Sequence, residues 1–287
     1  MKQDCYTEEA VAAHDGLPAA THEDAGYYAD YKGDSELLGR ALAEGFAYQG
    51  QASVCTGKNR GEVCTHLPPT AFISFIQNHD QIGNRAFGER LGAITDPAAL
   101  RALVATYLLL PQIPMIFMGE EWNASTPFPY FCDFHGELAD KVRQGRRDEF
   151  KKFPEFQDPE MRDRIPDPLA ESTFDSAKLK WEEMQTDQHV ECLSRHRSLI
   201  GVRHREITPL LSSIRGNAGA FDVVGPGAVV VRWASEDGRE LRLYANLCDR
   251  AKDSFPESEG RVLWHQGPEI HGTTLGPWTV HWTLKDA

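Results

Sequence analysis

Two short apolar segments on either side of an amphipathic helix constrain the fold of this chain most strongly. Residues 71–76 (AFISFI) and 113–118 (IPMIFM) have the length and the aromatic and β-branched content of buried strands. Between them, Asp96 and Pro97 are a helix-start signal, and Pro111 stops the helix. Its apolar residues recur on one face, at Leu100, Leu103, Val104, Tyr107 and Leu108. This order predicts a βαβ unit with two parallel strands.

The chain changes its hydrophobic period after about residue 208. Residues 228–234 and 240–247 flank the turn signal Asp237-Gly238, which predicts a β-hairpin. Near the C-terminus, apolar residues alternate with polar ones at Trp278, Val280, Trp282 and Leu284. We therefore expect two domains, an α/β part over 1–212 and an antiparallel β domain over 213–287.

Other helices are expected over 35–46, with Ser35 as the N-cap, over 137–150 and over 190–202. The first 33 residues read as irregular, with several glycines and a proline. The basic residues Arg143, Arg146 and Arg147 alternate with acids, which favours a solvated helix face. Trp233, Trp264, Trp278 and Trp282 could form a sugar platform, but their alternation favours the core of a sheet.

The charge balance excludes several kinds of partner. The chain has 43 acidic and 30 basic residues and a net charge of −13. Binding to nucleic acid or to an anionic membrane surface needs a basic face, so neither is expected. No apolar run is long enough for a membrane span, and the N-terminus has no stretch of signal-peptide length. We therefore expect a cytoplasmic protein.

The cysteines and histidines do not predict a metal site. The six cysteines include no CxxC pair, and Cys55 and Cys64 match no zinc spacing. Reduced thiols are expected, and a Cys55–Cys64 disulfide remains an alternative. His14, His22 and His66 also lack the spacing of metal ligands.

Polar residues are densest directly after the first predicted strand, in the segment QNHDQIGNR (77–85). In parallel α/β folds the carboxyl ends of the strands form the active face, so Asn78, His79 and Asp80 would emerge there together. Arg85 could hold a carboxylate through two parallel hydrogen bonds. The alternative is a capped polar turn without a functional role.

A second polar cluster, Glu120-Glu121-Trp122, follows the second predicted strand. A tryptophan face suits stacking on a sugar ring, and carboxylates suit hydroxyl groups. The alternative is a pair of loop acids beside a packing tryptophan. No Walker loop, GxGxxG or GxSxG motif is present, which argues against phosphate-loop and nucleophile-elbow enzymes.

These segments resemble a known family. QNHDQIGNRAFGERL, IPMIFMGEEWNASTPFPYF and DFHGELADKVRQGRRDEF are similar to the maltooligosyltrehalose trehalohydrolases of the α-amylase superfamily. The resemblance implies that 71–76 and 113–118 are strands seven and eight of an eight-stranded β/α barrel, which 190–202 would close. The fold class expected is thus α/β, the C-terminal part of a β/α (TIM) barrel followed by an all-β antiparallel sandwich domain.

The resemblance also implies roles for individual residues. Asp80 matches the third carboxylate of the family, which stabilises the transition state. The residues expected to bind substrate are Asn78, His79, Gln81, Arg85, Glu120, Glu121 and Trp122. No metal or other cofactor is implied. The partner implied is a maltooligosaccharide-type substrate.

The family's other two carboxylates have no match in this sequence. They are the nucleophile after the fourth strand and the general acid/base after the fifth, and retaining hydrolysis needs both. The chain is therefore interpreted as a glycoside hydrolase fragment, inactive alone, whose N-terminal half is missing or supplied by another chain. The parent would hydrolyse the α-1,4 bond next to the terminal trehalose unit. The alternatives are a non-catalytic glucan-binding remnant and another amylase-type enzyme, such as a glucan branching enzyme.

Overall fold

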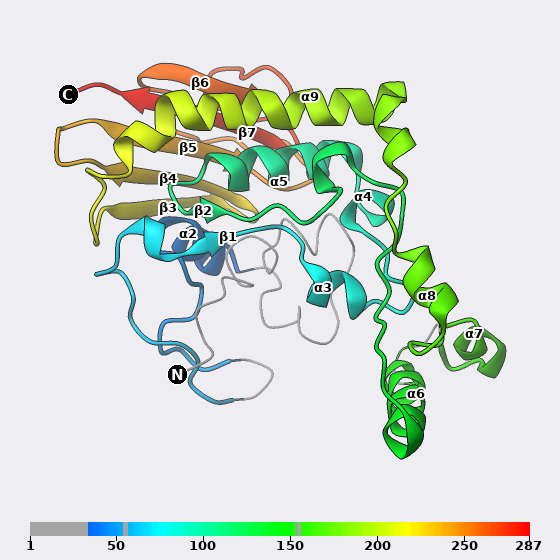
Figure 1. Ribbon diagram of the computed structural model, residues 1–287. Coiled ribbons are helices and arrows are strands. Elements are labelled where there is room, and N and C mark those ends of the chain that lie inside the picture. The colour runs from blue at the N-terminus through cyan, green and yellow to red at the C-terminus, as the bar shows by residue number, and fades with distance from the viewer. Residues whose placement is uncertain (1–33, 54–56, 152, 154–155) are drawn as a thin grey trace. The chain divides into compact units, whose positions relative to one another are not determined.

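The computed structural model describes residues 34–53, 57–151, 153 and 156–287 (Figure 1). The described residues fall into two compact units, one of 34–53, 57–76, 95–115 and 194–287 and the other of 77–94, 116–151, 153 and 156–193. The first unit includes α2 (Ser35–Glu44), η2 (Pro69–Ala71), β1 (Ile73–Ser74), α5 (Pro97–Leu109), β2 (Ile113–Pro114), η6 (Arg203–Ile207), η7 (Thr208–Leu210), β3 (Gly219–Gly225), β4 (Ala228–Ala234), β5 (Glu240–Asn246), β6 (Arg261–Gln266) and β7 (Thr279–Lys285).

The second unit is helical within its described residues. Its elements are α3 (His79–Gly83), α4 (Leu91–Ile94), η3 (Glu120–Trp122), α6 (Gly136–Phe150), α7 (Pro159–Asp163), α8 (Glu171–Ser176) and η5 (Trp181–Gln185). The long helix α9 (Asp187–Val202) begins in this unit and ends in the other.

The predicted parallel strand pair is confirmed. β1 and β2 pair in parallel, with Ile73 opposite Ile113 and Ser74 opposite Pro114. Asp96 caps the intervening helix α5 as expected, since its carboxylate accepts hydrogen bonds from two backbone amides of the first turn. Both strands are shorter than predicted. The first segment begins inside the 3₁₀ turn η2, and β2 ends at Pro114, although the Met115 amide still donates to the Ser74 carbonyl at 2.9 Å.

The cap of helix α2 differs from the prediction by one residue. Asp34, not Ser35, is the N-cap, and its carboxylate accepts from the amides of Glu36 and Leu37. The Ser35 hydroxyl instead accepts from the amide of Gly227. An aspartate and a serine are nearly equal caps, so the sequence alone does not decide between neighbours.

The C-terminal strands form one antiparallel sheet of five, in the order β3-β4-β5-β7-β6 (Figure 1). The predicted hairpin is confirmed, because β4 and β5 pair over their full lengths around a turn that contains Gly238 at φ 86°. The antiparallel domain is thus present. Within the described residues it is a single sheet, and helices rather than a second sheet cover one of its faces.

Trp233 and Trp282 fix these helices on the sheet. Both rings are fully buried and stack at 5.7 Å between centroids. The Trp233 indole donates to the Ala43 carbonyl of α2, and the Trp282 indole donates to the Ala105 carbonyl of α5. For these two residues the sheet-core interpretation is confirmed. The domain boundary at 212/213 stays a prediction, and it would cut through this buried packing.

The opposite face of the sheet is also buried, although polar residues alternate with apolar ones along β7. Tyr244, Phe255 and Leu275 form a core there with Ala228 and Val230. Phe255 comes from the loop between β5 and β6, and Leu275 comes from the loop between β6 and β7. Polar residues of β7 therefore lie in the interior.

His281 is one of these buried polar residues. Its Nε2 lies 2.9 Å from the Ser258 hydroxyl, and its ring packs against Tyr244 and His265. Burial, aided by the nearby His265, lowers the pKa of His281 from 6.5 to about 4. The folded chain therefore keeps this imidazole neutral at pH values where the unfolded chain protonates it.

Acid is expected to weaken the fold through His281. As the pH falls from about 7 to about 4.5, the unfolded state binds the proton first, which costs the folded state about 2 kcal/mol. Urea unfolding at both pH values should show a loss that is about 2 kcal/mol larger in the wild type than in His281→Gln, because the carboxylates that also titrate are common to both chains. The exposed His271→Gln serves as control and should behave as the wild type. Equal losses in all three chains would contradict the prediction.

Arg203 joins the end of α9 to the end of α5. Its guanidinium is buried and donates to the carbonyls of Leu108, Leu110 and Gln112, at 3.0, 2.5 and 2.6 Å. Pro111 ends α5 here, and Arg203 satisfies carbonyls that the helix cannot. Burial lowers the pKa of Arg203 to about 10.

Two sequence predictions touch residues outside the described ranges. The first 33 residues, which are expected to be irregular and contain His14 and His22, lie outside these ranges, as does Cys55, one half of the possible Cys55–Cys64 pair. Among the helices of the described residues, none is long and apolar enough to cross a membrane.

Candidate functional site

The polar segment after β1 forms the short helix α3, and Asn78 is its N-cap. The Asn78 backbone is extended, and its side-chain oxygen accepts from the Gln81 amide at 2.8 Å. The side chain is buried. For Asn78 the structure therefore supports the capped-turn alternative, because its amide group already serves the helix.

His79 and Asp80 occupy the first turn of α3 and extend into solvent. Their side chains are 68% and 62% exposed, and His79 Nε2 lies 3.3 Å from Asp80 Oδ1. Since Asn78 caps the helix, the Asp80 carboxylate is not needed for capping. Both side chains can reach a ligand, and their assigned roles stay predictions.

Arg146 of α6 anchors the other end of α3. Its Nη2 donates to the carbonyls of Gly83 and Arg85, at 2.5 and 2.7 Å, and its guanidinium lies over the Phe150 ring. Burial lowers the pKa of Arg146, and Glu149 opposes that effect. The prediction of a solvated arginine face is wrong for Arg146. The missed signal is its spacing from the buried residues Ala139 and Phe150 on α6.

Gln77 links the two polar clusters. Its side-chain nitrogen donates to Glu120 Oε2 at 3.1 Å, and its side-chain oxygen accepts from the Leu91 amide at 3.2 Å. Both Gln77 and Glu120 are buried. The structure thus brings the predicted clusters together, through a residue that the sequence analysis did not select.

The second cluster forms the 3₁₀ turn η3, which lies between the left-handed residues Gly119 and Asn123. Trp122 is only 1% exposed and packs against Trp181, with 5.3 Å between ring centroids. The expectation that Trp122 offers its face to a sugar does not fit this packing, and the packing-tryptophan alternative does. Glu121 is half-buried, and its Oε2 has no hydrogen-bond partner among the described residues.

Arg90 is a buried cation beside this turn that the sequence did not reveal. It donates to the carbonyls of Thr126 and Met118, at 2.6 and 2.8 Å, and lies over the Phe117 ring. Burial lowers the pKa of Arg90, whereas the carboxylates of Glu120, Glu121 and Glu183 raise it. Arg90 thus shapes the backbone around η3 and offsets part of the acidic charge.

The remaining predicted residues lie near the α3 turn. Arg85 Nη1 donates to the Glu89 carbonyl at 3.3 Å. Gln81 is half-buried, and its side-chain oxygen has no hydrogen-bond partner among the described residues. The described part of the chain contains no cluster of histidine, cysteine and acidic side chains that could hold a metal ion.

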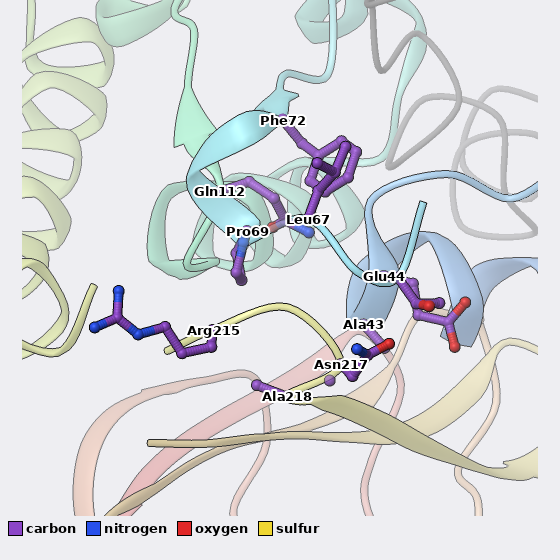
Figure 2. A pocket seen from close by; sticks show the side chains of 11 residues that line it. Ala43, Glu44, Leu67, Pro69, Phe72, Gln112, Arg215, Asn217 and Ala218 are labelled. Atoms are coloured by element: carbon purple, nitrogen blue, oxygen red, sulfur yellow. The ribbon is translucent and has the colours of Figure 1, made fainter. Parts of the chain in front are cut away.

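A separate hollow lies in the first unit, and Figure 2 shows the side chains that line it. Phe72, Gln112 and Arg215 are among them. Gln112 donates to the Leu42 carbonyl, and Arg215 pairs with Glu236. None of the predicted site residues lines this hollow.

Comparisons with known proteins find one family model and several relatives that match parts of this chain. Residues 216–282 match a family model described as a domain of unknown function, DUF3459. The malto-oligosyltrehalose trehalohydrolase of Deinococcus radiodurans is 40% identical over 195 residues, covering 67% of this chain and 32% of that protein. The protein of the same name from Saccharolobus solfataricus is 34% identical over 240 residues, covering 82% and 39%.

A solved structure is similar over nearly the whole chain. The crystal structure of a putative α-amylase from Salmonella typhimurium matches with a TM-score of 0.86 and 38% identity. The match covers 96% of this chain and 46% of that one. The chain spans about a third of the length of the curated relatives described above.

Proposed function

Because the chain is related in sequence to malto-oligosyltrehalose trehalohydrolases, glycoside hydrolases of the α-amylase family, we propose that it contributes to an active site of that kind. The reaction proposed is hydrolysis of the α-1,4 bond next to the terminal trehalose unit of maltooligosyltrehalose, which releases trehalose. The enzyme would be a polypeptide or complex that contains this chain.

The solvent-exposed pair His79–Asp80 carries the proposal. Asn78 caps α3 from one end and Arg146 anchors it from the other, so the turn presents Asp80 in a fixed place. A carboxylate held beside a flattening sugar ring stabilises the positive charge that develops in the transition state. In this proposal the exposed His79 donates a hydrogen bond to a sugar hydroxyl.

A single carboxylate cannot complete retaining hydrolysis, which needs a nucleophile and an acid/base about 5 Å apart. We propose that both come from residues beyond this sequence, in the same polypeptide or in a partner. Water is the acceptor, and no step of the proposed reaction requires a cofactor.

The purified chain alone is therefore expected to release no trehalose from maltooligosyltrehalose. Free trehalose is measured after incubation of the substrate with the chain and with Asp80→Asn. Turnover by the chain that disappears in Asp80→Asn would contradict the assignment of the other carboxylates to residues beyond it. In an enzyme that contains the chain, new α-1,6 branches in place of trehalose would instead indicate a branching enzyme.

A further inference from the structure

Trp181 presents its ring to solvent, although it belongs to a firmly held turn. The side chain is 64% exposed and begins the 3₁₀ turn η5. Its ring contacts the buried Trp122 ring at 5.3 Å between centroids and an interplanar angle of 40°. The exposed ring therefore rests on a rigid aromatic support.

Hydrogen bonds fix this support. His189 Nδ1 lies 2.7 Å from the Trp122 carbonyl oxygen, and His189 Nε2 lies 3.5 Å from Glu183 Oε2. The Ser125 amide also donates to Glu183 Oε2, at 3.2 Å. Since Glu183 and Trp181 lie in the same turn, these contacts connect the turn that carries Trp181 to the backbone of Trp122 and Ser125. Such a platform loses little conformational entropy when a ligand binds.

Polar groups border the aromatic surface. Lys180 and Glu182, the residues on either side of Trp181 in the sequence, are exposed and charged. An aromatic face with a polar rim is complementary to a sugar ring, which has an apolar C–H face and a rim of hydroxyls.

We infer that Trp181 is a stacking residue for a glucose unit of an α-1,4-linked glucan chain. The inference rests on the proposed function for its substrate class. The supporting Trp122 shares the turn η3 with Glu120, which accepts a hydrogen bond from Gln77 directly before the α3 turn. A single tryptophan among charged side chains suits one sugar ring better than a broad apolar protein surface.

Calorimetric titration of the purified chain with maltoheptaose tests this inference. We expect saturable binding by the wild type, about tenfold weaker binding by Trp181→Ala, and binding within about threefold of the wild type by Trp181→Phe. Phe134→Ala removes another exposed aromatic ring of the same unit and should leave the affinity unchanged. Circular dichroism confirms that each variant is folded.

Three outcomes would overturn the inference. They are equal affinity of the wild type and Trp181→Ala, no binding of maltoheptaose by the folded wild type, and a change of oligomeric state in Trp181→Ala with unchanged glucan affinity. The last outcome would assign the platform to a second copy of the chain. The proposed hydrolysis fails separately, if an enzyme containing this chain binds glucan through Trp181 but releases no trehalose.

Discussion

Replacing Arg203 by alanine is expected to lower the free energy of unfolding by about 3 to 5 kcal/mol. Three backbone carbonyls share this guanidinium, and they come from the end of α5 and the segment that leads into β2. Without Arg203 they would stay buried and unsatisfied, at a cost of about 1 to 3 kcal/mol each. A loss of this size is a large part of the stability of an ordinary domain.

Urea unfolding of Arg203→Ala and of two companion variants provides the measurement. Arg205→Ala removes an exposed arginine from the same π-helical turn and should change stability by less than about 0.5 kcal/mol. Arg203→Lys keeps the charge but not the planar fork, so we expect a loss between those of the other two. A loss below about 1 kcal/mol in Arg203→Ala would show that water replaces the guanidinium.

The second large effect concerns catalysis. In an active polypeptide that contains this chain, Asp80→Asn is expected to lower kcat by about 10²-fold or more, or about 2.7 kcal/mol. The amide keeps the shape of the side chain but removes the charge that stabilises the transition state. KM should change less, because ground-state contacts with the sugar remain.

The structure sharpens this test, because it assigns the capping role to Asn78 and not to Asp80. Asp96 provides the matched control, since its carboxylate caps α5 and asparagine caps helices about equally well. Asp96→Asn should therefore leave kcat and the melting midpoint nearly unchanged. Near-normal kcat in Asp80→Asn would mean that the resemblance assigns Asp80 the wrong role.

The elements that the sequence predicts well depend on local signals. Asp96-Pro97 fixes the start of α5, and Asp237-Gly238 fixes the β4–β5 hairpin, because capping and turn chemistry act over a few residues. Alternation along β7 predicts its buried tryptophan. The same alternation does not predict the burial of His281. Whether loops cover the second face of the sheet depends on residues that are distant in the chain.

Local sequence signals do not predict the contacts that hold the candidate site. Arg90, Arg146 and Arg203 each donate to backbone carbonyls of a distant segment. Because every residue has a backbone carbonyl, the residue types do not show which carbonyls accept these bonds. A buried arginine also looks like a surface arginine in composition and charge pattern. Gln77 was missed for a similar reason, since its importance lies in the partner Glu120.

The two tryptophans of the site show the same limit. Trp122 follows a predicted strand, which suggests a ligand contact, yet it is the buried support. Trp181 lies in an irregular polar segment, yet it is the exposed ring. Which of two stacked rings faces solvent depends on tertiary packing, and neither periodicity nor propensity encodes it.

The anchor between Arg146 and the α3 turn does not depend on the side chains at residues 83 and 85. Arg146 recognises the carbonyl oxygens of residues 83 and 85, which every amino acid possesses. A Cβ at Gly83 would meet its nearest atoms at 3.8 Å, an ordinary contact distance. A side chain introduced at residue 83 by mutation would therefore leave both carbonyl acceptors of the anchor in place, and with them the position of the Asp80 carboxylate.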